Sequence, residues 1–220
     1  MATQNPFAAT DVGIFRFEGG RLQVFLVDLM IEPFIGSRAL PGTLVRDTED
    51  LTTASERAYR EAMGQGRAYF EQVFTFSGLD RDPRQRSIST AYMVLPERDD
   101  KVPRTSKKYA RGFWCDVDKV PDLAFDHKRI VEVCVDRIRA KLNYSSIALL
   151  LLPQKFTLTE LQTVYEYCLD RQIDKRNFRK KMLSLDLLEP TELRRTGERA
   201  RPAMLYRAKE RDMKVIPLFK

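Results

Sequence analysis

Apolar and polar residues alternate in several stretches of the first hundred positions, with the period of two that is typical of half-buried β-strands. Residues 10–30 contain two such stretches, VGIFRF and LQVFLVDL, separated by the turn-forming EGGR, and this pattern predicts a β-hairpin. Further strands are predicted in AYFEQVFTFSG (68–78) and ISTAYMVLP (88–96), on either side of the polar loop LDRDPRQR, and in ARGFWCDVDKVP (110–121). The N-terminal part is therefore expected to fold around a sheet.

Two helices are predicted beside these strands. Thr53 and Glu56 have the spacing of a capping box that opens a helix over residues 53–63, and the glycines of the following GQG end it. Asp126 is expected to cap a second helix over residues 127–142, where apolar residues recur every three or four positions. Strands and helices in this order predict an α+β fold.

The C-terminal part begins after a predicted hinge, NYSSIALLLLPQKF at residues 143–156. Thr157 and Glu160 form a second capping box, and Phe156 with Leu161 has the spacing of a hydrophobic staple. The buried stripe expected on this helix consists of Leu161, Val164, Tyr165 and Cys168.

A basic helix and a hairpin follow. The helix is expected to start after its N-cap Asp174 and to run to Leu185, and two short strands around a tip rich in glycine, arginine and proline come next. Helix, turn, basic helix and hairpin is the order of a winged helix-turn-helix. We therefore divide the chain into residues 1–145 and residues 146–220. The residues of the basic helix predicted to face inward are Phe178, Met182 and Leu185.

Most of the excess positive charge lies in this second part. The formal net charge is +7, and residues 155–220 hold 16 Lys+Arg against 10 Asp+Glu. Residues 1–154 are therefore close to neutral. A basic module beside a near-neutral one indicates a polyanionic partner, although an ordinary solvated basic surface has the same composition.

Composition narrows the class of protein further. Hydrophobic residues make up 43% of the chain, enough for a packed core and too many for global disorder. The three cysteines are too far apart for a disulfide framework or a zinc site. The longest apolar run, IALLLLP, is shorter than a membrane span, and the N-terminus lacks a signal-peptide pattern. We expect a cytoplasmic protein without a membrane partner.

The segment between the hairpin and the third strand carries a recognisable motif. Residues 43–65 have the spacing of the Nudix box, G-x5-E-x7-R-E-U-x-E-E-x-G-U, in which U is aliphatic. Four positions match it, namely Glu49, Arg57, Glu61 and Gly64, and four depart from it, namely Thr43, Ala58, Ala62 and Gln65. The N-terminal module thus resembles a Nudix domain, which implies an α/β/α sandwich with a mixed sheet.

The departures bear on catalysis. Positions 58, 61 and 62 share one face of a helix, and in active Nudix enzymes this face carries carboxylates that hold Mg²⁺ against a pyrophosphate. Here Glu61 is the one carboxylate left, beside Ala58 and Ala62. The resemblance therefore implies a catalytically inactive domain that requires no cofactor and no Mg²⁺. Weak metal binding through one carboxylate plus substrate oxygens stays open.

Stretches over residues 10–208 are similar to the Nudix-related transcriptional regulators of NAD metabolism, the NrtR family. These stretches are PFIGSRALPG, FEQVFTFSGLDRDPRQRSIS, LAFDHKRIV, FTLTELQTVYE, NFRKKM and GERARPAMLYR. The resemblance implies that the first domain senses an NAD-related nucleotide, typically ADP-ribose, and that the second binds palindromic operator DNA as a homodimer. The residues themselves do not separate ADP-ribose from NAD, ATP or phosphoribosyl pyrophosphate.

The arginine-rich loop DRDPRQR is the first candidate for binding this effector, because guanidinium groups pair with diphosphates through charge-assisted hydrogen bonds. The alternatives are a solvated loop here and an ordinary helix ion pair for Arg57 and Glu61. His127 is interpreted as a helix-start residue rather than a catalytic base. The candidate effector-binding residues are Arg81, Arg84, Arg86, Arg57, Glu61 and Glu49.

The basic helix is the candidate DNA-reading element. Lysines suit phosphates, whereas asparagine pairs with adenine and arginine with guanine at base edges. Arginines at the hairpin tip suit a phosphate or a narrow minor groove. The candidate DNA-binding residues are Lys175, Arg176, Asn177, Arg179, Lys180, Arg199 and Arg201.

Three functions from different classes are therefore weighed. The favoured one is a ligand-controlled transcriptional repressor of NAD-metabolism genes. The second is an ADP-ribose pyrophosphatase of the Nudix type with an accessory winged-helix domain, against which Ala58 and Ala62 count. The third is a nucleotide-binding protein whose basic module contacts another protein.

Overall fold

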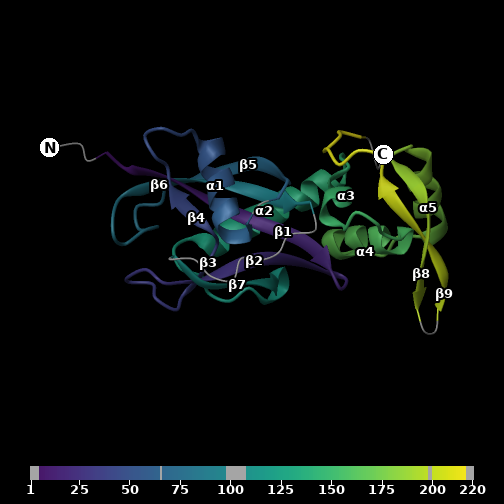
Figure 1. Ribbon diagram of the computed structural model, residues 1–220, viewed down its shortest axis with the longest axis horizontal. Helices are drawn as coiled ribbons and strands as arrows, with labels where there is room; N and C mark the ends of the chain where they lie inside the picture. Colours follow the sequence, from purple (N-terminus) through teal and green to yellow (C-terminus); the bar gives the residue numbers. More distant parts are fainter. Residues whose placement is uncertain (1–4, 65, 98–107, 198–199, 217–220) are drawn as a thin grey trace. The chain divides into compact units, whose positions relative to one another are not determined.

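The computed structural model describes residues 5–64, 66–97, 108–197 and 200–216. The chain divides into a first compact unit of residues 1–15 and 23–137, and a second of residues 16–22 and 138–220 (Figure 1). This division falls earlier than the boundary that the sequence analysis placed after residue 145. Within the described ranges, each helix is too short or too polar to cross a lipid bilayer.

The first unit is built on a mixed sheet of seven strands. They are β1 (Phe7–Glu18), β2 (Arg21–Leu29), β3 (Arg38–Ala39), β4 (Gly42–Leu44), β5 (Ala68–Phe76), β6 (Ser87–Pro96) and β7 (Tyr109–Asp116). The order is β3-β2-β1-β6-β5, with β4 paired to β1 and β7 to β2. β1 and β6 run parallel, whereas β5 and β6 are antiparallel. The strands predicted from alternation are confirmed.

Two glycines make the turn of the predicted hairpin. Gly19 and Gly20 lie between β1 and β2 with φ of 59° and 78°, in the left-handed region that residues with a Cβ rarely adopt. Consecutive positive φ angles suit the right-handed twist of the two strands. The sequence EGGR therefore forms the turn because its two glycines can adopt positive φ angles.

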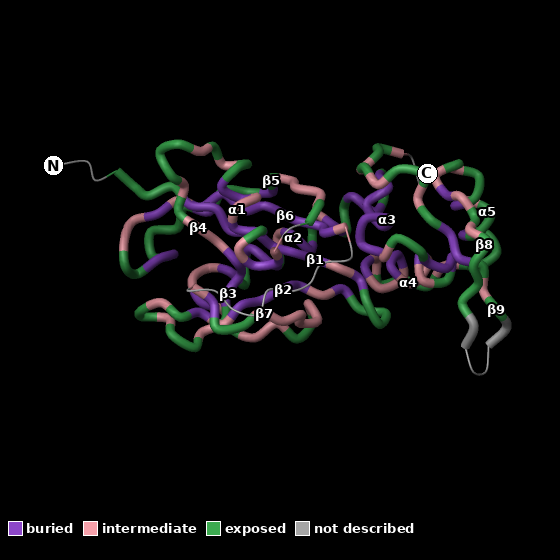
Figure 2. The backbone as a smooth tube through the Cα atoms, in the orientation of Figure 1, coloured by how far each residue is buried: buried purple, intermediate pink, exposed green. Residues whose placement is uncertain are grey.

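Helices cover both faces of this sheet. They are α1 (Leu51–Met63) and α2 (His127–Leu142), and a short 3-10 helix, η1 (Val117–Lys119), follows β7. On β1, Val12 and Ile14 belong to the apolar cluster that includes Ala58 of α1. Between them, a Cβ at Gly13 would lie 3.2 Å from Sγ of Cys134 on α2. Because alternate residues of a strand face opposite sides, the predicted α/β/α sandwich is confirmed, with buried strands between the helices (Figure 2).

The start of α1 differs from the prediction. The helix begins at Leu51, and the side chain of Asp50 caps it by accepting a hydrogen bond of 2.7 Å from the N–H of Thr53. Thr53 is therefore the capped residue and not the cap, and Glu56 instead faces Arg60 at 3.4 Å. The sequence offered two acceptors three residues apart, and the stronger carboxylate acceptor is used. The helix ends at Gly64, as predicted.

The second unit has the predicted order of a winged helix-turn-helix. Its elements are α3 (Ile147–Leu151), α4 (Leu158–Leu169), α5 (Lys175–Ser184), β8 (Leu188–Gly197) and β9 (Ala200–Ala208). The prediction of a hinge at 143–156 is wrong, because α3 occupies the middle of this segment and all five of its residues are buried. An apolar run of this kind folds into the core of its own unit instead of linking two units.

The local signals in α4 and α5 are largely confirmed. Thr157 and Glu160 form the predicted capping box, and the four residues of the expected stripe are buried. Asp174 caps α5 through the N–H of Asn177. The ring of Phe178 packs edge-on against Tyr165, with centroids 5.5 Å apart. Leu185 is only half-buried, because the helix ends there.

Gly112 in β7 is a position where the packing leaves no room for a side chain. The ring of the fully buried Phe25 on β2 lies over this glycine, so a Cβ there would come within 2.1 Å of Cζ. Gly112→Ala is expected to lower the free energy of unfolding by about 1–3 kcal/mol through overpacking. Urea unfolding measures this change. At Gly78 the nearest atom to a Cβ is 3.9 Å away, so Gly78→Ala is the control, and equal losses in the two variants would contradict the packing.

Candidate effector cavity and nucleic-acid interface

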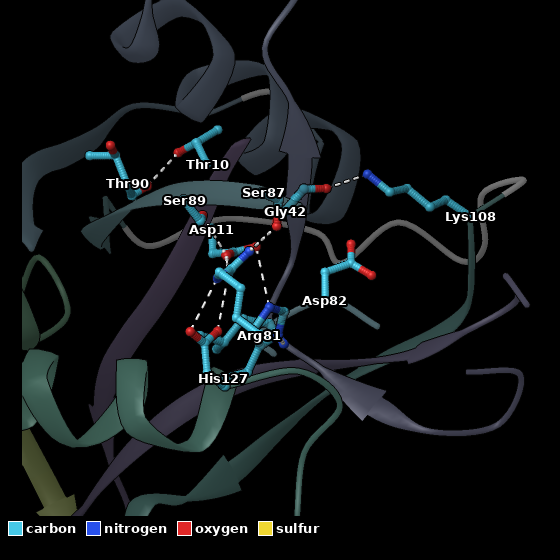
Figure 3. A network of polar contacts seen from close by, with 12 residues as sticks. Thr10, Asp11, Gly42, Arg81, Asp82, Ser87, Ser89, Thr90, Lys108 and His127 are labelled. Carbon is cyan, nitrogen blue, oxygen red and sulfur yellow. Dashed lines mark hydrogen bonds and ion pairs between the residues drawn. The ribbon is translucent and has the colours of Figure 1, made fainter. Parts of the chain in front are cut away.

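The first unit contains a buried ion network (Figure 3). The guanidinium of Arg81 donates to Asp11 Oδ2 at 2.9 Å and to both carboxylate oxygens of Asp126 at 2.9 and 3.1 Å. It also donates to Ser87 Oγ at 3.1 Å, and its side chain is only 5% exposed. The arginine therefore joins β1, β6 and the start of α2. Arg81 lies at the edge of the candidate site, but its guanidinium already donates to Asp11, Asp126 and Ser87.

Asp126 lies at the predicted position before α2, where its backbone carbonyl accepts from the N–H of Ile130 at 3.3 Å. It precedes α2, as expected of an N-cap, but both oxygens of its carboxylate accept from Arg81. His127 is the first residue of α2, as predicted. The ion network therefore also holds the start of α2, because a buried guanidinium needs carboxylate partners.

His127 extends the network through both ring nitrogens. Nδ1 accepts from the backbone N–H of Leu40 at 2.9 Å, so the ring proton is on Nε2, which lies 3.3 Å from Asp11 Oδ1. Burial raises the pKa of Asp11, but its contacts with His127, Arg81 and Ser89 outweigh burial and hold that pKa well below the usual range. Asp11 is therefore an anion at neutral pH, and it accepts from Arg81 and Ser89 and faces Nε2 of His127.

A cavity of about 430 Å³ opens beside this network. Its lining combines apolar side chains such as Leu29, Leu40 and Phe125 with charged ones. The charged and polar residues of the lining are Asp11, Thr43, Arg81, Asp82, Arg84, Gln85, Ser87, Lys108, Tyr109 and His127. This mixture is typical of a small-molecule site, where apolar walls exclude water and a few polar groups orient the ligand.

Arg84 is the loop arginine best placed to meet a ligand in the cavity. Its guanidinium donates to Asp82 at 2.8 and 2.9 Å, and its Cζ lies 5.7 and 5.3 Å from the ring centroids of Phe34 and Phe125. The side chain is 36% exposed. Arg86 lies elsewhere, because its guanidinium donates to the backbone carbonyls of Ser77, Gly78 and Ser87.

The residues of the Nudix-box helix form a separate ion network. Arg57 donates to both oxygens of Glu49, to Glu61 Oε1 at 3.1 Å and to Thr43 Oγ1 at 2.8 Å. Hydrogen bonds from Arg57 lower the pKa of Glu49 to about 2. Of these four residues, Thr43 is among the described residues that line the cavity. The network ties the loop before α1 to the helix itself.

Sequence reasoning missed Lys108, just before β7. Its ammonium donates to the carbonyl oxygen of Gly42 and lies 3.9 Å from Glu61 Oε2. Figure 3 shows the side chain extended towards Gly42. Burial lowers its pKa. No local pattern marked this lysine, because it is one of several cations in KVPRTSKKYARG and only the fold brings it to Gly42.

The two alanines of the Nudix-box helix lie in the core. Ala58 is 0% and Ala62 4% exposed, and both belong to the apolar cluster under α1. Neither offers an oxygen to a metal. Among the described residues, no group of three or more His, Cys, Asp and Glu side chains is placed to hold a metal ion.

The candidate nucleic-acid interface lies on α5. The five α5 residues predicted to contact DNA are all exposed, whereas Phe178 and Met182 are buried. The turn between α4 and α5 is held by Gln162 Nε2, which donates to the carbonyl of Ile173 at 2.9 Å, and by Glu166, which accepts from the N–H of Ile173 at 3.0 Å. These hydrogen bonds therefore fix the start of α5 relative to α4.

The hairpin β8–β9 forms the wing. Phe156 and Tyr206 exchange backbone hydrogen bonds, which join β9 to the segment before α4. Arg195 on β8 donates to Glu160, the acid of the capping box. Arg199 lies outside the described residues, as does the side chain of Arg201. Arg194, which the sequence analysis did not select, is exposed on the wing.

The buried network predicts a large cost for removing Arg81. Arg81→Met would leave Asp11 and Asp126 without their cation, and we expect a loss of about 3–5 kcal/mol in the free energy of unfolding. Arg129 on α2 pairs with Glu132 at the surface, with a side chain 65% exposed, so Arg129→Met should cost less than about 1 kcal/mol. Urea unfolding at neutral pH compares the two. Similar losses would show that Arg81 is not structurally required.

Comparisons with known proteins agree with both parts of the molecule. Residues 148–208 match the NrtR DNA-binding winged helix domain family. The ADPR-responsive transcriptional repressor NtrR of Acinetobacter baylyi is 31% identical over 208 residues, which cover 92% of this chain and 82% of that protein.

Two solved structures from Shewanella oneidensis are also similar. NrtR in complex with a 27mer DNA is 32% identical with a TM-score of 0.79, covering 92% of this chain and 93% of that one. The Nudix domain of NrtR in complex with ADP-ribose is 25% identical with a TM-score of 0.56, covering 62% and 90%. The chain belongs to the NrtR family, whose members combine a Nudix domain with a DNA-binding winged helix.

Proposed function

We propose that this protein is a transcriptional repressor of NAD-metabolism genes. It binds operator DNA through its winged helix and responds to an NAD-related nucleotide such as ADP-ribose. The observation that carries the proposal is the exposed basic face of α5, held on a helix-turn-helix scaffold with a wing. The similar proteins named as an ADPR-responsive repressor and as NrtR bound to DNA support it.

The chemistry of α5 suits both parts of DNA recognition. Lys175 and Lys180 present ammonium groups that suit phosphates, and contacts of this kind supply salt-dependent affinity. Asn177 and Arg179 have side chains that form paired hydrogen bonds with adenine and guanine edges in the major groove. One winged helix reads only a few base pairs, so we propose a homodimer on a palindrome with half-sites related by a two-fold axis.

The cavity of the first unit suits a nucleotide diphosphate. Its volume of about 430 Å³ lies within the range of small-molecule sites, roughly 300–1,000 Å³. Phe34 and Phe125 beside Arg84 provide aromatic surface next to a cation. We assign ligand contact to Arg84, whereas Arg81 supports the site from the buried network. Arg57 holds Thr43 of the cavity lining from behind, and Glu49 and Glu61 in turn hold Arg57.

We propose that the domain binds its nucleotide without hydrolysing it. Ala58 and Ala62 offer no carboxylates, so the donor set for activating water is lost from α1. The alternative, an ADP-ribose pyrophosphatase, requires Mg²⁺-dependent turnover near the usual enzyme range of about 1–10³ s⁻¹. An assay of phosphate-ester products with ADP-ribose and Mg²⁺ decides between them, and we expect no turnover above background.

Substitutions on α5 separate phosphate contacts from base contacts. Lys180→Ala should weaken binding to all duplexes alike and reduce the salt slope by about one. Arg179→Ala should instead cost about 1–3 kcal/mol on the operator and little on random DNA. Fluorescence anisotropy with an operator selected from genomic fragments measures both. Lys128→Ala, at an exposed pair on α2, is the control. Undiminished binding after replacing Arg176, Arg179 and Lys180 together would refute α5 as the reading helix.

Two arginines of one loop test the effector site. Arg84→Ala should lower the affinity for ADP-ribose by about tenfold or more, because it removes a charge-assisted hydrogen bond to phosphate. Arg86→Ala is the matched control and should leave the affinity almost unchanged, since its guanidinium is engaged with backbone carbonyls. Isothermal titration calorimetry measures both. A loss confined to Arg86→Ala would place the ligand elsewhere.

A further inference from the structure

The carbonyl of Gly42 and the carboxylate of Glu61 both face Lys108. The ammonium of Lys108 donates to Gly42 O and lies 3.9 Å from Glu61 Oε2. It also lies 5.4 Å from the ring centroid of Tyr109. Its side chain is 31% exposed and lines the cavity together with Arg84.

These groups do not fit Mg²⁺. The carbonyl oxygen of Gly42 accepts from Lys108 and, at 3.2 Å, from the hydroxyl of Tyr109, so both of its lone pairs are used. Burial raises the pKa of Tyr109, which keeps that hydroxyl a donor. Glu61 Oε1 accepts from Arg57 at 3.1 Å. A magnesium ion needs several oxygens in octahedral geometry at about 2.0–2.1 Å, and here cations already hold them.

The position of Lys108 gives it a different task. It is the cation that reaches the cavity from the β7 side, whereas Arg84 reaches it from the loop between β5 and β6. Beside the buried Arg81, Lys108 and Arg84 are the two partly exposed cations of the described lining. Together they suit the two phosphates of a diphosphate, because an ammonium binds phosphate as a point charge and a guanidinium binds it bidentately.

We propose that the Lys108 ammonium takes the place of the metal ion of a Nudix site and binds the diphosphate of the effector, so that nucleotide binding requires no divalent cation. The inference rests on the proposed function, since it specifies how the same cavity holds its nucleotide. It accounts for two departures of the Nudix box, Ala58 and Ala62. With Lys108 in place, acidic groups at positions 58 and 62 have no metal to hold.

The test is calorimetry of the full-length protein with ADP-ribose, in excess EDTA and in excess MgCl₂. The wild-type affinity is expected to be the same in both. Lys108→Gln should lower it about 10- to 100-fold, the worth of a hydrogen bond to a charged group, and Lys108→Arg should restore most of it. AMP, which has no diphosphate, should lose less affinity than ADP-ribose in Lys108→Gln.

Controls separate this inference from the proposed function. Lys128→Gln removes an exposed lysine that pairs with Asp122 and should bind as the wild type does. Loss of wild-type binding in EDTA overturns the inference without any substitution, and so does wild-type affinity in Lys108→Gln. A wild-type protein that binds no nucleotide under either condition overturns the effector assignment itself, and the inference with it. Unfolding curves without ligand check that each variant is folded.

Discussion

The buried guanidinium of Arg81 is the interaction on which the first unit depends. It joins Asp11 of β1 to Asp126 at the start of α2, and it comes from the loop between β5 and β6. A buried cation without a partner costs several kcal/mol of folding free energy. The three segments therefore have to come together for Arg81 to be buried. His127 and Leu40 continue the same network to the segment before β4. The walls of the cavity are therefore fixed by charge pairing as well as by the apolar core.

The three arginines of one short loop have different roles in this structure. Arg81 points into the protein and supports the site, Arg84 lines the cavity beside two aromatic rings, and Arg86 fastens the loop to its own backbone carbonyls. From the sequence the three have the same chemistry. Only burial and partners distinguish them, and the carboxylate partners of Arg81 come from segments 45 and 70 residues away along the chain.

Local signals could be predicted and distant ones could not. The alternation in β1 and β2 and the capping box of Thr157 and Glu160 are complete within a few residues, so the sequence alone predicts them. The choice of Asp50 as the cap of α1 was a competition between neighbours. The burial of α3 could not be predicted in this way, because it depends on distant segments that pack around the helix.

The candidate sites divide along the same line. The basic face of α5 follows from charge and helical period, because all its members lie on one element. The effector cavity does not, since Lys108 and Gly42 are 66 residues apart and meet only through the pairing of the sheet. A lone lysine carries no spacing that sequence reasoning could use. The family resemblance indicated that a nucleotide binds, whereas the contacts came from the fold.

The central claim is that one chain couples nucleotide binding to DNA binding. The most direct measurement is the affinity for operator DNA by anisotropy, with and without saturating ADP-ribose, in EDTA. Coupling between two ligands typically changes affinity by about 5- to 150-fold and is reciprocal, so the account predicts a change of that size, mirrored in the affinity for ADP-ribose when operator is present. An operator affinity that stays the same while ADP-ribose is demonstrably bound would contradict it.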